Sequence, residues 1–168
     1  MKLLVIRHAI AQERETFAHT GKSDDERPLT ADGRRRMARA ASGLRALVPK
    51  LDLLAASPLV RAQQTAKIVA KEYGIDVGET TPALEADASA AVFAKWLSSH
   101  SARDVVAVVG HEPQLSMLVT RLMGGPPDAR VEFKKGGAAL LEFTGASVSD
   151  GARLLWLLTP KSLRGVGG

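Results

Sequence analysis

Two arginines and two histidines in this 168-residue sequence are side chains of the kinds that bind phosphate. They are Arg7, His8, Arg61 and His111, and the set contains no carboxylate. A guanidinium can hold two phosphate oxygens at once, and an imidazole can add a further hydrogen bond. If the fold brings the four together, they favour a site for a doubly charged anion, with phosphate as the first candidate.

All four residues follow short apolar runs that are typical of buried strands. The Arg-His pair directly follows Leu3–Ile6, and His111 comes two residues after the β-branched run Val105–Val109. Arg61 lies in the first turn of the helix predicted after Leu53–Ala56. Ligands of open α/β sheets bind beyond the carboxyl ends of the strands. We therefore expect these side chains on one edge of a sheet.

The position of Arg61 itself favours an anion, because a cation in the first turn of a helix meets the positive end of the helix dipole. A bound anion would turn this small penalty into a gain. Each residue alone also has an ordinary explanation, since an Arg-His pair arises by chance and a lone histidine near a strand end is usually a packing residue. The joint arrangement is more specific than any of its members.

Strand-like and helix-like segments alternate along the chain. This pattern predicts an α/β fold, a three-layer α/β/α sandwich with a mostly parallel central sheet, in one domain over residues 1–168. Two late strands allow an antiparallel member. The further predicted helices cover about 30–48, 59–73, a weaker segment after Asp87 and 114–122, and the late strands cover 138–143 and 154–158.

Local signals predict where several of these helices begin and end. Ser57-Pro58 reads as an N-cap followed by proline at the first helical position. We expect Gly74 to end the helix over 59–73 and Asp87 to cap the weaker helix that follows it. The helix over 114–122 is expected to end at Gly124-Gly125-Pro126-Pro127.

Composition excludes several classes of function. There is no cysteine, so disulfides and thiolate sites are impossible. We also expect no metal and no cofactor. The net charge of +5 comes without an aromatic ladder, because the sequence has four Phe and one Tyr, so nucleic-acid binding is not expected. The apolar start is too short for a signal peptide and no run could cross a membrane. We expect a cytoplasmic monomer.

The motifs resemble those of the histidine phosphatase superfamily, which includes the phosphoglycerate mutases. The residues that carry this resemblance are Arg7-His8, Ser57-Pro58, Arg61-Ala62, Thr65-Ala66 and Gly110-His111. The small size and further motifs resemble the SixA-type phosphohistidine phosphatases, and these motifs are Arg27-Pro28-Leu29-Thr30, Gly33 and a C-terminal strand at Leu158-Thr159-Pro160. One departure is Ala9, which stands where the superfamily motif has a glycine that permits φ > 0.

The resemblance implies a metal-independent phosphatase that works through a phosphohistidine intermediate. It makes His8 the nucleophile, Arg7 and Arg61 the clamp on the phosphoryl oxygens, and His111 a further donor. Arg27 either binds phosphate or steadies its loop. Lys134-Lys135-Gly136-Gly137 either rims the site or forms a solvated turn.

Superfamily members that act on esters use an acid from the segment after the second helix. The resemblance makes Glu85 the candidate, with Asp87 and Glu112 as alternatives and a solvated loop carboxylate as the ordinary reading. A phosphoramidate weakens this requirement, because imidazole leaves more easily than an alkoxide.

The connecting segments are short, so we expect an open pocket without a lid. Such a pocket suits phosphohistidine on another protein, for example a histidine phosphotransfer domain. A small-molecule phosphatase acting on sugar phosphates, nucleotides or pyrophosphates is the alternative enzyme. A non-catalytic phosphate-binding module is the third hypothesis.

Overall fold

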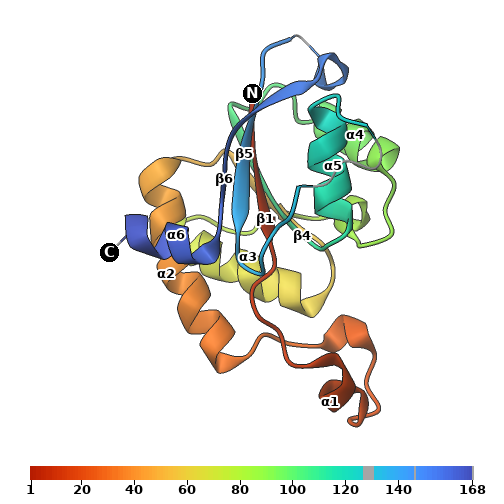
Figure 1. Cartoon of the computed structure of the whole chain (residues 1–168), viewed down its shortest axis with the longest axis vertical. Helices are drawn as coiled ribbons and strands as arrows, with labels where there is room; N and C mark the ends of the chain where they lie inside the picture. The colour runs from red at the N-terminus through yellow and green to blue at the C-terminus, as the bar shows by residue number, and fades with distance from the viewer. Residues whose placement is uncertain (127–130, 146, 168) are drawn as a thin grey trace.

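The computed structural model describes residues 1–126, 131–145 and 147–167, and it consists of one six-stranded sheet with helices on both faces (Figure 1). The strands are β1 (Lys2–Arg7), β2 (Leu53–Ala56), β3 (Glu79–Thr80), β4 (Val105–Gly110), β5 (Ala138–Phe143) and β6 (Ala152–Leu158). The helices are α1 (Arg14–Ala18), α2 (Ala31–Leu47), α3 (Val60–Tyr73), α4 (Ala90–Ser98), α5 (Gln114–Leu122) and α6 (Pro160–Val166). Three short 3₁₀ helices are η1 (Asp24–Glu26), η2 (Pro82–Leu84) and η3 (Val148–Asp150).

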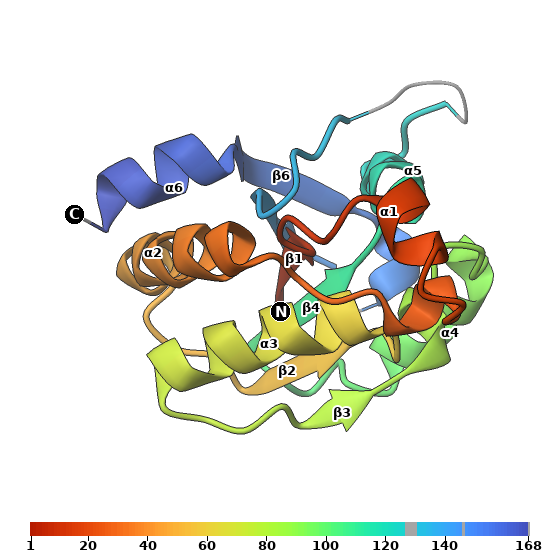
Figure 2. The same ribbon diagram turned by 90° about the horizontal axis from the view of Figure 1, so that it is seen from below.

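The strand order is β3-β2-β4-β1-β5-β6. The first four of these strands are parallel to one another, β5 is antiparallel to β1, and β6 is antiparallel to β5. This confirms the predicted α/β fold with a mostly parallel sheet and antiparallel pairing near the C-terminus. Because β1, β2 and β4 run in the same direction, their carboxyl ends meet at one edge of the sheet, which Figure 2 shows from below.

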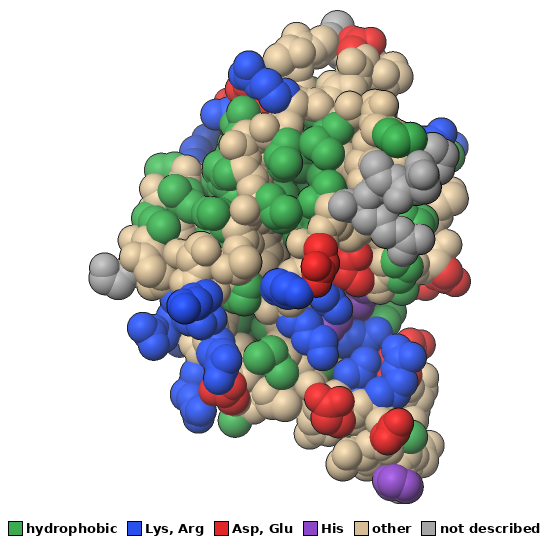
Figure 3. Space-filling model, viewed as in Figure 1, with side chains coloured by type: hydrophobic (Ala, Val, Ile, Leu, Met, Phe, Trp, Pro, Cys, Tyr) green, Lys and Arg blue, Asp and Glu red, His purple; other side chains and the backbone are tan. Residues whose placement is uncertain are grey.

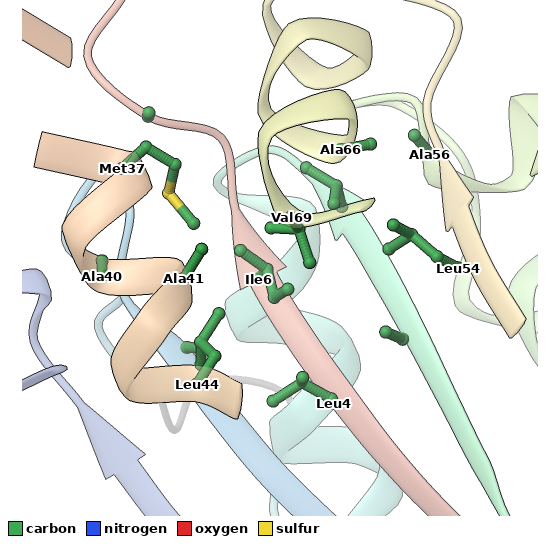
Figure 4. Packing of buried hydrophobic residues seen from close by; sticks show 14 of the residues in the cluster. Leu4, Ile6, Met37, Ala40, Ala41, Leu44, Leu54, Ala56, Ala66 and Val69 are labelled. Atoms are coloured by element: carbon green, nitrogen blue, oxygen red, sulfur yellow. The ribbon is translucent and has the colours of Figure 1, made fainter. Parts of the chain in front are cut away.

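Alternating residues of β1 build two separate cores. Leu4 and Ile6 face α2, α3 and α6, while Leu3 and Val5 face α4 and α5. Figure 4 shows the first core, in which Ile6 lies between residues of α2 and Val69 of α3. A strand covered on both faces needs apolar residues at every position, and this explains the unbroken run before Arg7.

Two helix boundaries agree with the sequence predictions, and two N-cap predictions are wrong. Thr30 caps α2 by accepting a hydrogen bond from the amide of Gly33, and Gly74 ends α3 in the left-handed conformation with φ 67°. However, α3 begins only at Val60, so Ser57 does not cap it. Ser89, and not Asp87, caps α4.

The C-terminal segment also differs from the predicted strand at Leu158-Thr159-Pro160. Strand β6 ends at Leu158, and α6 follows at once, because Thr159 provides its N-cap and proline fits the first helical position. Helix α6 packs against α2 so closely that a Cβ on Gly43 would lie 1.9 Å from the carbonyl oxygen of Leu163.

The short elements α1 and β3 were not predicted. Helix α5 ends at Leu122, before Gly124 with φ 73°, and Pro127 of the predicted stop signal lies outside the described residues. No helix in the described part of the chain has the length and apolar character needed to cross a membrane.

Candidate active site

A pocket of about 250 Å³ opens at the sheet edge where β1, β2 and β4 end. In Figure 3, Lys and Arg side chains surround histidine atoms in this region. The pocket contains all four residues singled out in the sequence, together with Arg27. Its lining consists of Arg7, His8, Glu13, Arg14, Arg27, Arg61, Ala86, His111, Glu112 and Lys135.

The two histidines lie side by side in the pocket wall. The centroids of the His8 and His111 rings are 5.1 Å apart, and the rings are tilted by 51°. Only 6% of His8 and 2% of His111 is exposed. Two buried imidazolium ions at this distance would repel each other, so at least one of the two rings must be neutral.

The ring of His8 is fixed by the backbone of the next residue, Ala9. Its Nδ1 lies 2.7 Å from the carbonyl oxygen of Ala9, and because a carbonyl can only accept, Nδ1 carries the proton. The Nε2 atom of the neutral ring therefore carries a lone pair. The pKa of His8 is lowered to about 3, mainly because the ring is buried. The hydrogen bond to Ala9 raises the pKa, whereas the guanidiniums of Arg61 and Arg7 lower it further. At neutral pH the ring is uncharged.

His111 is held by Ser57, the residue expected to cap α3. The Ser57 hydroxyl lies 2.8 Å from Nε2 of His111, so it links the end of β2 to the end of β4. Burial, followed by the proximity of His8 and of the arginines, lowers the pKa of His111 to about 3. Its Nδ1 is buried without a hydrogen-bond partner among the described residues.

Arg7 and Arg61 line the pocket, and in each of them only some of the guanidinium nitrogens have a hydrogen-bond partner. Nη1 of Arg7 donates to the carbonyl of Phe133 at 2.6 Å, and Nη1 of Arg61 donates to the carbonyl of Asp24 at 2.9 Å. In both residues Nε is buried and has no partner in the described part of the chain. Buried donors are costly when unpaired.

Comparison with known proteins identifies the family of the chain. The family model of the histidine phosphatase superfamily (branch 1) matches residues 3–88. The chain belongs to this superfamily. It is accordingly a phosphatase of that group. An uncharacterized protein of Picosynechococcus is 30% identical over 97% of this chain and 99% of its own length.

Solved structures of two phosphatases share the fold. The protein histidine phosphatase SixA complexed with tungstate has a TM-score of 0.83 at 22% identity, with 97% of this chain and 99% of that chain covered. The alpha-ribazole phosphatase from Shigella flexneri has a TM-score of 0.73 at 21% identity, with 95% and 97% covered. At these identities the similarities show that the fold is shared.

The alanine that replaces the superfamily's motif glycine fits its place without strain. No non-glycine residue in the described part of the chain has a positive φ, so Ala9 does not need the left-handed conformation. The amide of Ala9 donates to Oγ1 of Thr65 at 3.0 Å, and this hydroxyl donates to the carbonyl of Arg61 at 2.7 Å. Thr65 thus ties the loop of His8 to the helix of Arg61.

Asp24 holds three arginines of the pocket, and sequence analysis missed it. One carboxylate oxygen lies 2.7 Å from Nε of Arg27 and 3.5 Å from Nε of Arg14, and the other lies 3.2 Å from Nη1 of Arg61. The hydrogen bond from Arg27 is the main cause that lowers the pKa of Asp24. No sequence signal distinguishes Asp24 from the acidic residues beside it.

Arg27 lies in the wall of the pocket and contacts the loop that carries it. It is 7% exposed, it lines the pocket, and its Nη1 donates to the carbonyl of Gln12 at 2.7 Å. The side chain therefore steadies the loop that carries it while it adds positive charge to the wall of the pocket.

The three candidate acids differ in position. Glu112 lines the pocket, where Oε2 accepts from Oγ of Ser116 at 2.5 Å and Oε1 is buried without a partner among the described residues. Glu85 is half-buried and Asp87 is exposed, and neither lines the pocket. In the described part of the chain, no three His, Asp or Glu side chains converge to hold a metal ion.

Proposed function

We propose that this protein removes the phosphoryl group from phosphohistidine on another protein and carries it transiently on His8. The observation that supports this most is the state of the His8 ring, which is neutral, with Nδ1 held by Ala9 and Nε2 unprotonated. A nucleophile must offer such a lone pair, and a ring with a pKa near 6.5 would be partly protonated at neutral pH.

In the first step, Nε2 of His8 bonds to phosphorus while the P–N bond of the substrate breaks. Arg7, Arg61 and His111 all line the pocket, and their guanidinium and imidazole groups would bind the phosphoryl oxygens. Phosphoryl transfer depends mainly on positioning and charge stabilisation, and this is what fixed cations provide. In the second step, water attacks phosphorus, the P–N bond to His8 breaks, and phosphate leaves.

A phosphohistidine substrate does not require a general acid from the enzyme. The second ring nitrogen of phosphohistidine can already carry a proton, so the ring leaves as neutral imidazole. An alkoxide would need a proton from the enzyme, and of the three candidate acids only Glu112 lines the pocket. The open pocket also suits a phosphorylated side chain on a protein surface, and SixA, with the same fold, is a protein histidine phosphatase.

Hydrolysis of a small phosphate ester is the second candidate function. Glu112 favours it, because this residue lines the pocket together with His111 and one of its carboxylate oxygens has no hydrogen-bond partner among the described residues. In this reaction Glu112 would protonate the leaving alkoxide. The alpha-ribazole phosphatase of similar fold shows that this architecture also accommodates small-molecule phosphatases.

Turnover of two substrate classes separates the two candidates. The protein is incubated with a phosphohistidine-bearing phosphotransfer domain and, separately, with a panel of sugar phosphates, nucleotides and p-nitrophenyl phosphate. We expect efficient release of phosphate from the domain and slow ester hydrolysis. His8→Ala should abolish both reactions, whereas the exposed His19→Ala should change neither. Rapid ester turnover with an untouched phosphohistidine domain would overturn the proposal.

A further inference from the structure

A second cavity adjoins the phosphoryl pocket. It has a volume of about 380 Å³ and lies between α2, the segment 134–136 and the start of α6. Lys135 lines both cavities. His8 lines the first and its neighbour Ala9 lines the second, so the peptide between them separates the two.

The rim of this second cavity is strongly basic. Five cations line it and no carboxylate does, and the cations are Arg36, Lys134, Lys135, Lys161 and Arg164. Two of them are already paired, Arg36 with Asp32 at 2.6 Å and Lys134 with Glu132. The other three have no carboxylate within ion-pair distance in the part of the chain that the structure describes. They would attract an anionic partner.

The floor of the same cavity is apolar. It is formed by Ile10, Met37, Ala40 and Pro160, and Met37 and Ala40 are almost completely buried. A purely ionic ligand such as free phosphate would gain nothing from this floor. An apolar side chain with carboxylates beside it would match both the floor and the rim.

The second cavity is held in a fixed position relative to His8. The amide of Gly136 donates to the carbonyls of Arg7 and His8 at 3.2 and 3.1 Å, and the amide of Arg7 donates to the carbonyl of Gly137 at 3.0 Å. Gly136 has φ 81°, a conformation that favours glycine. The turn that carries Lys135 is therefore pinned to the backbone of the nucleophile, and a rigid partner could contact both cavities at once.

We infer that the second cavity docks an acidic segment of the phosphorylated protein. One apolar side chain of this segment enters above Met37, and its flanking carboxylates face Lys135, Lys161 and Arg164. This inference rests on the proposed function, because it requires a protein substrate. It assigns the specificity for the partner to α6 and the 134–136 turn, and it leaves the transfer of the phosphoryl group to the first pocket.

The test reverses charge on α6, away from the phosphoryl pocket. The double variant Lys161→Glu with Arg164→Glu is compared with Lys67→Glu with Lys71→Glu, which makes the same change in net charge on exposed positions of α3. For a phosphohistidine-bearing domain, we expect the KM of the α6 variant to be about tenfold or more above that of the wild type. This KM should also depend less on salt concentration than the wild-type KM does. Its hydrolysis of p-nitrophenyl phosphate should match that of the wild type.

Each other outcome has a distinct meaning. If the wild type acts on the domain and the α6 variant acts equally well, the docking inference is wrong and the proposed function stands. If the α6 variant loses ester hydrolysis as well, the second cavity belongs to the phosphoryl site and the inference is again overturned. If the wild type hydrolyses esters and ignores the domain, the proposed function fails and the docking inference fails with it.

Discussion

Oγ1 of Thr65 lies 3.0 Å from the amide nitrogen of Ala9 and accepts its hydrogen bond. Through this contact a residue in the second turn of α3 fixes the loop next to the nucleophile. Because the same hydroxyl donates to the carbonyl of Arg61, one side chain sets the distance between His8 and the guanidinium that would hold its phosphoryl group.

Thr65→Val is therefore expected to lower kcat by about 10- to 100-fold, because small displacements of reacting groups are costly. The change conserves shape, so the fold should persist, and Thr65→Ser should restore most of the rate by restoring the hydroxyl. Steady-state kinetics on a phosphohistidine domain measure the effect. A Thr65→Val protein with the wild-type kcat would show that this contact has no role in positioning.

Asp24→Asn should lower kcat about tenfold or more, because Arg61 and Arg27 lose the carboxylate that orients them. The neighbouring Asp25→Asn serves as the matched control and should behave as the wild type. The opposite hypothesis treats Asp24 as a counter-ion that competes with phosphate. It predicts a lower KM with an unchanged kcat, and this result would refute the positioning role.

Stability should fall as the pH drops below about 6.5. His8 and His111 are buried with pKa values lowered to about 3, whereas in the unfolded chain their pKa is about 6.5. Below 6.5 the unfolded state binds more protons, so each histidine reduces the free energy of unfolding by up to about 1.4 kcal/mol per pH unit. Above pH 6.5 neither histidine changes the free energy of unfolding with pH.

Urea unfolding between pH 6.5 and 5, in a buffer without phosphate, measures this slope. His111→Asn should remove about half of the slope, and the exposed His19→Asn should leave it unchanged. A slope that is the same in wild type and His111→Asn would mean that His111 is not held neutral by the fold.

Glu112→Gln tests which carboxylate serves the leaving group. We expect it to slow the hydrolysis of alkyl phosphates by about 10²-fold while phosphohistidine turnover changes little, because only an alkoxide needs the proton. Glu85→Gln, outside the pocket lining, is the control and should leave both reactions intact. If Glu85→Gln selectively lost ester hydrolysis instead, the general acid would be Glu85, next to η2, and not Glu112.

The main features of the fold could be predicted because they depend on long, regular signals. The continuous apolar run of β1 and the helical spacing of α2 come from burial on particular faces, and these patterns are visible in one sequence. Elements of a few residues, such as α1 and β3, contain too little periodicity. The start of α6 was missed because Thr159-Pro160 can end a strand as well as begin a helix.

The residues that line the pocket were partly predictable for the same reason. Arg7 is the last residue of β1, and His8 and His111 directly follow β1 and β4, so the topology fixes the edge on which they lie. Asp24, Ser57 and Thr65 act through single hydrogen bonds that depend on loop conformation, and polar residues in loops give no pattern to read. Ser57 was interpreted as a helix cap because that is the common role of its type before proline.

The most direct test of the account is to trap the phosphorylated enzyme. The protein is mixed with a phosphohistidine domain carrying labelled phosphate, quenched within milliseconds in alkaline detergent, and mapped by mass spectrometry. We predict an acid-labile, alkali-stable label on His8 that forms before free phosphate appears and is absent in His8→Ala. Release of phosphate at the wild-type rate by His8→Ala, or a label on any other residue, would contradict the account.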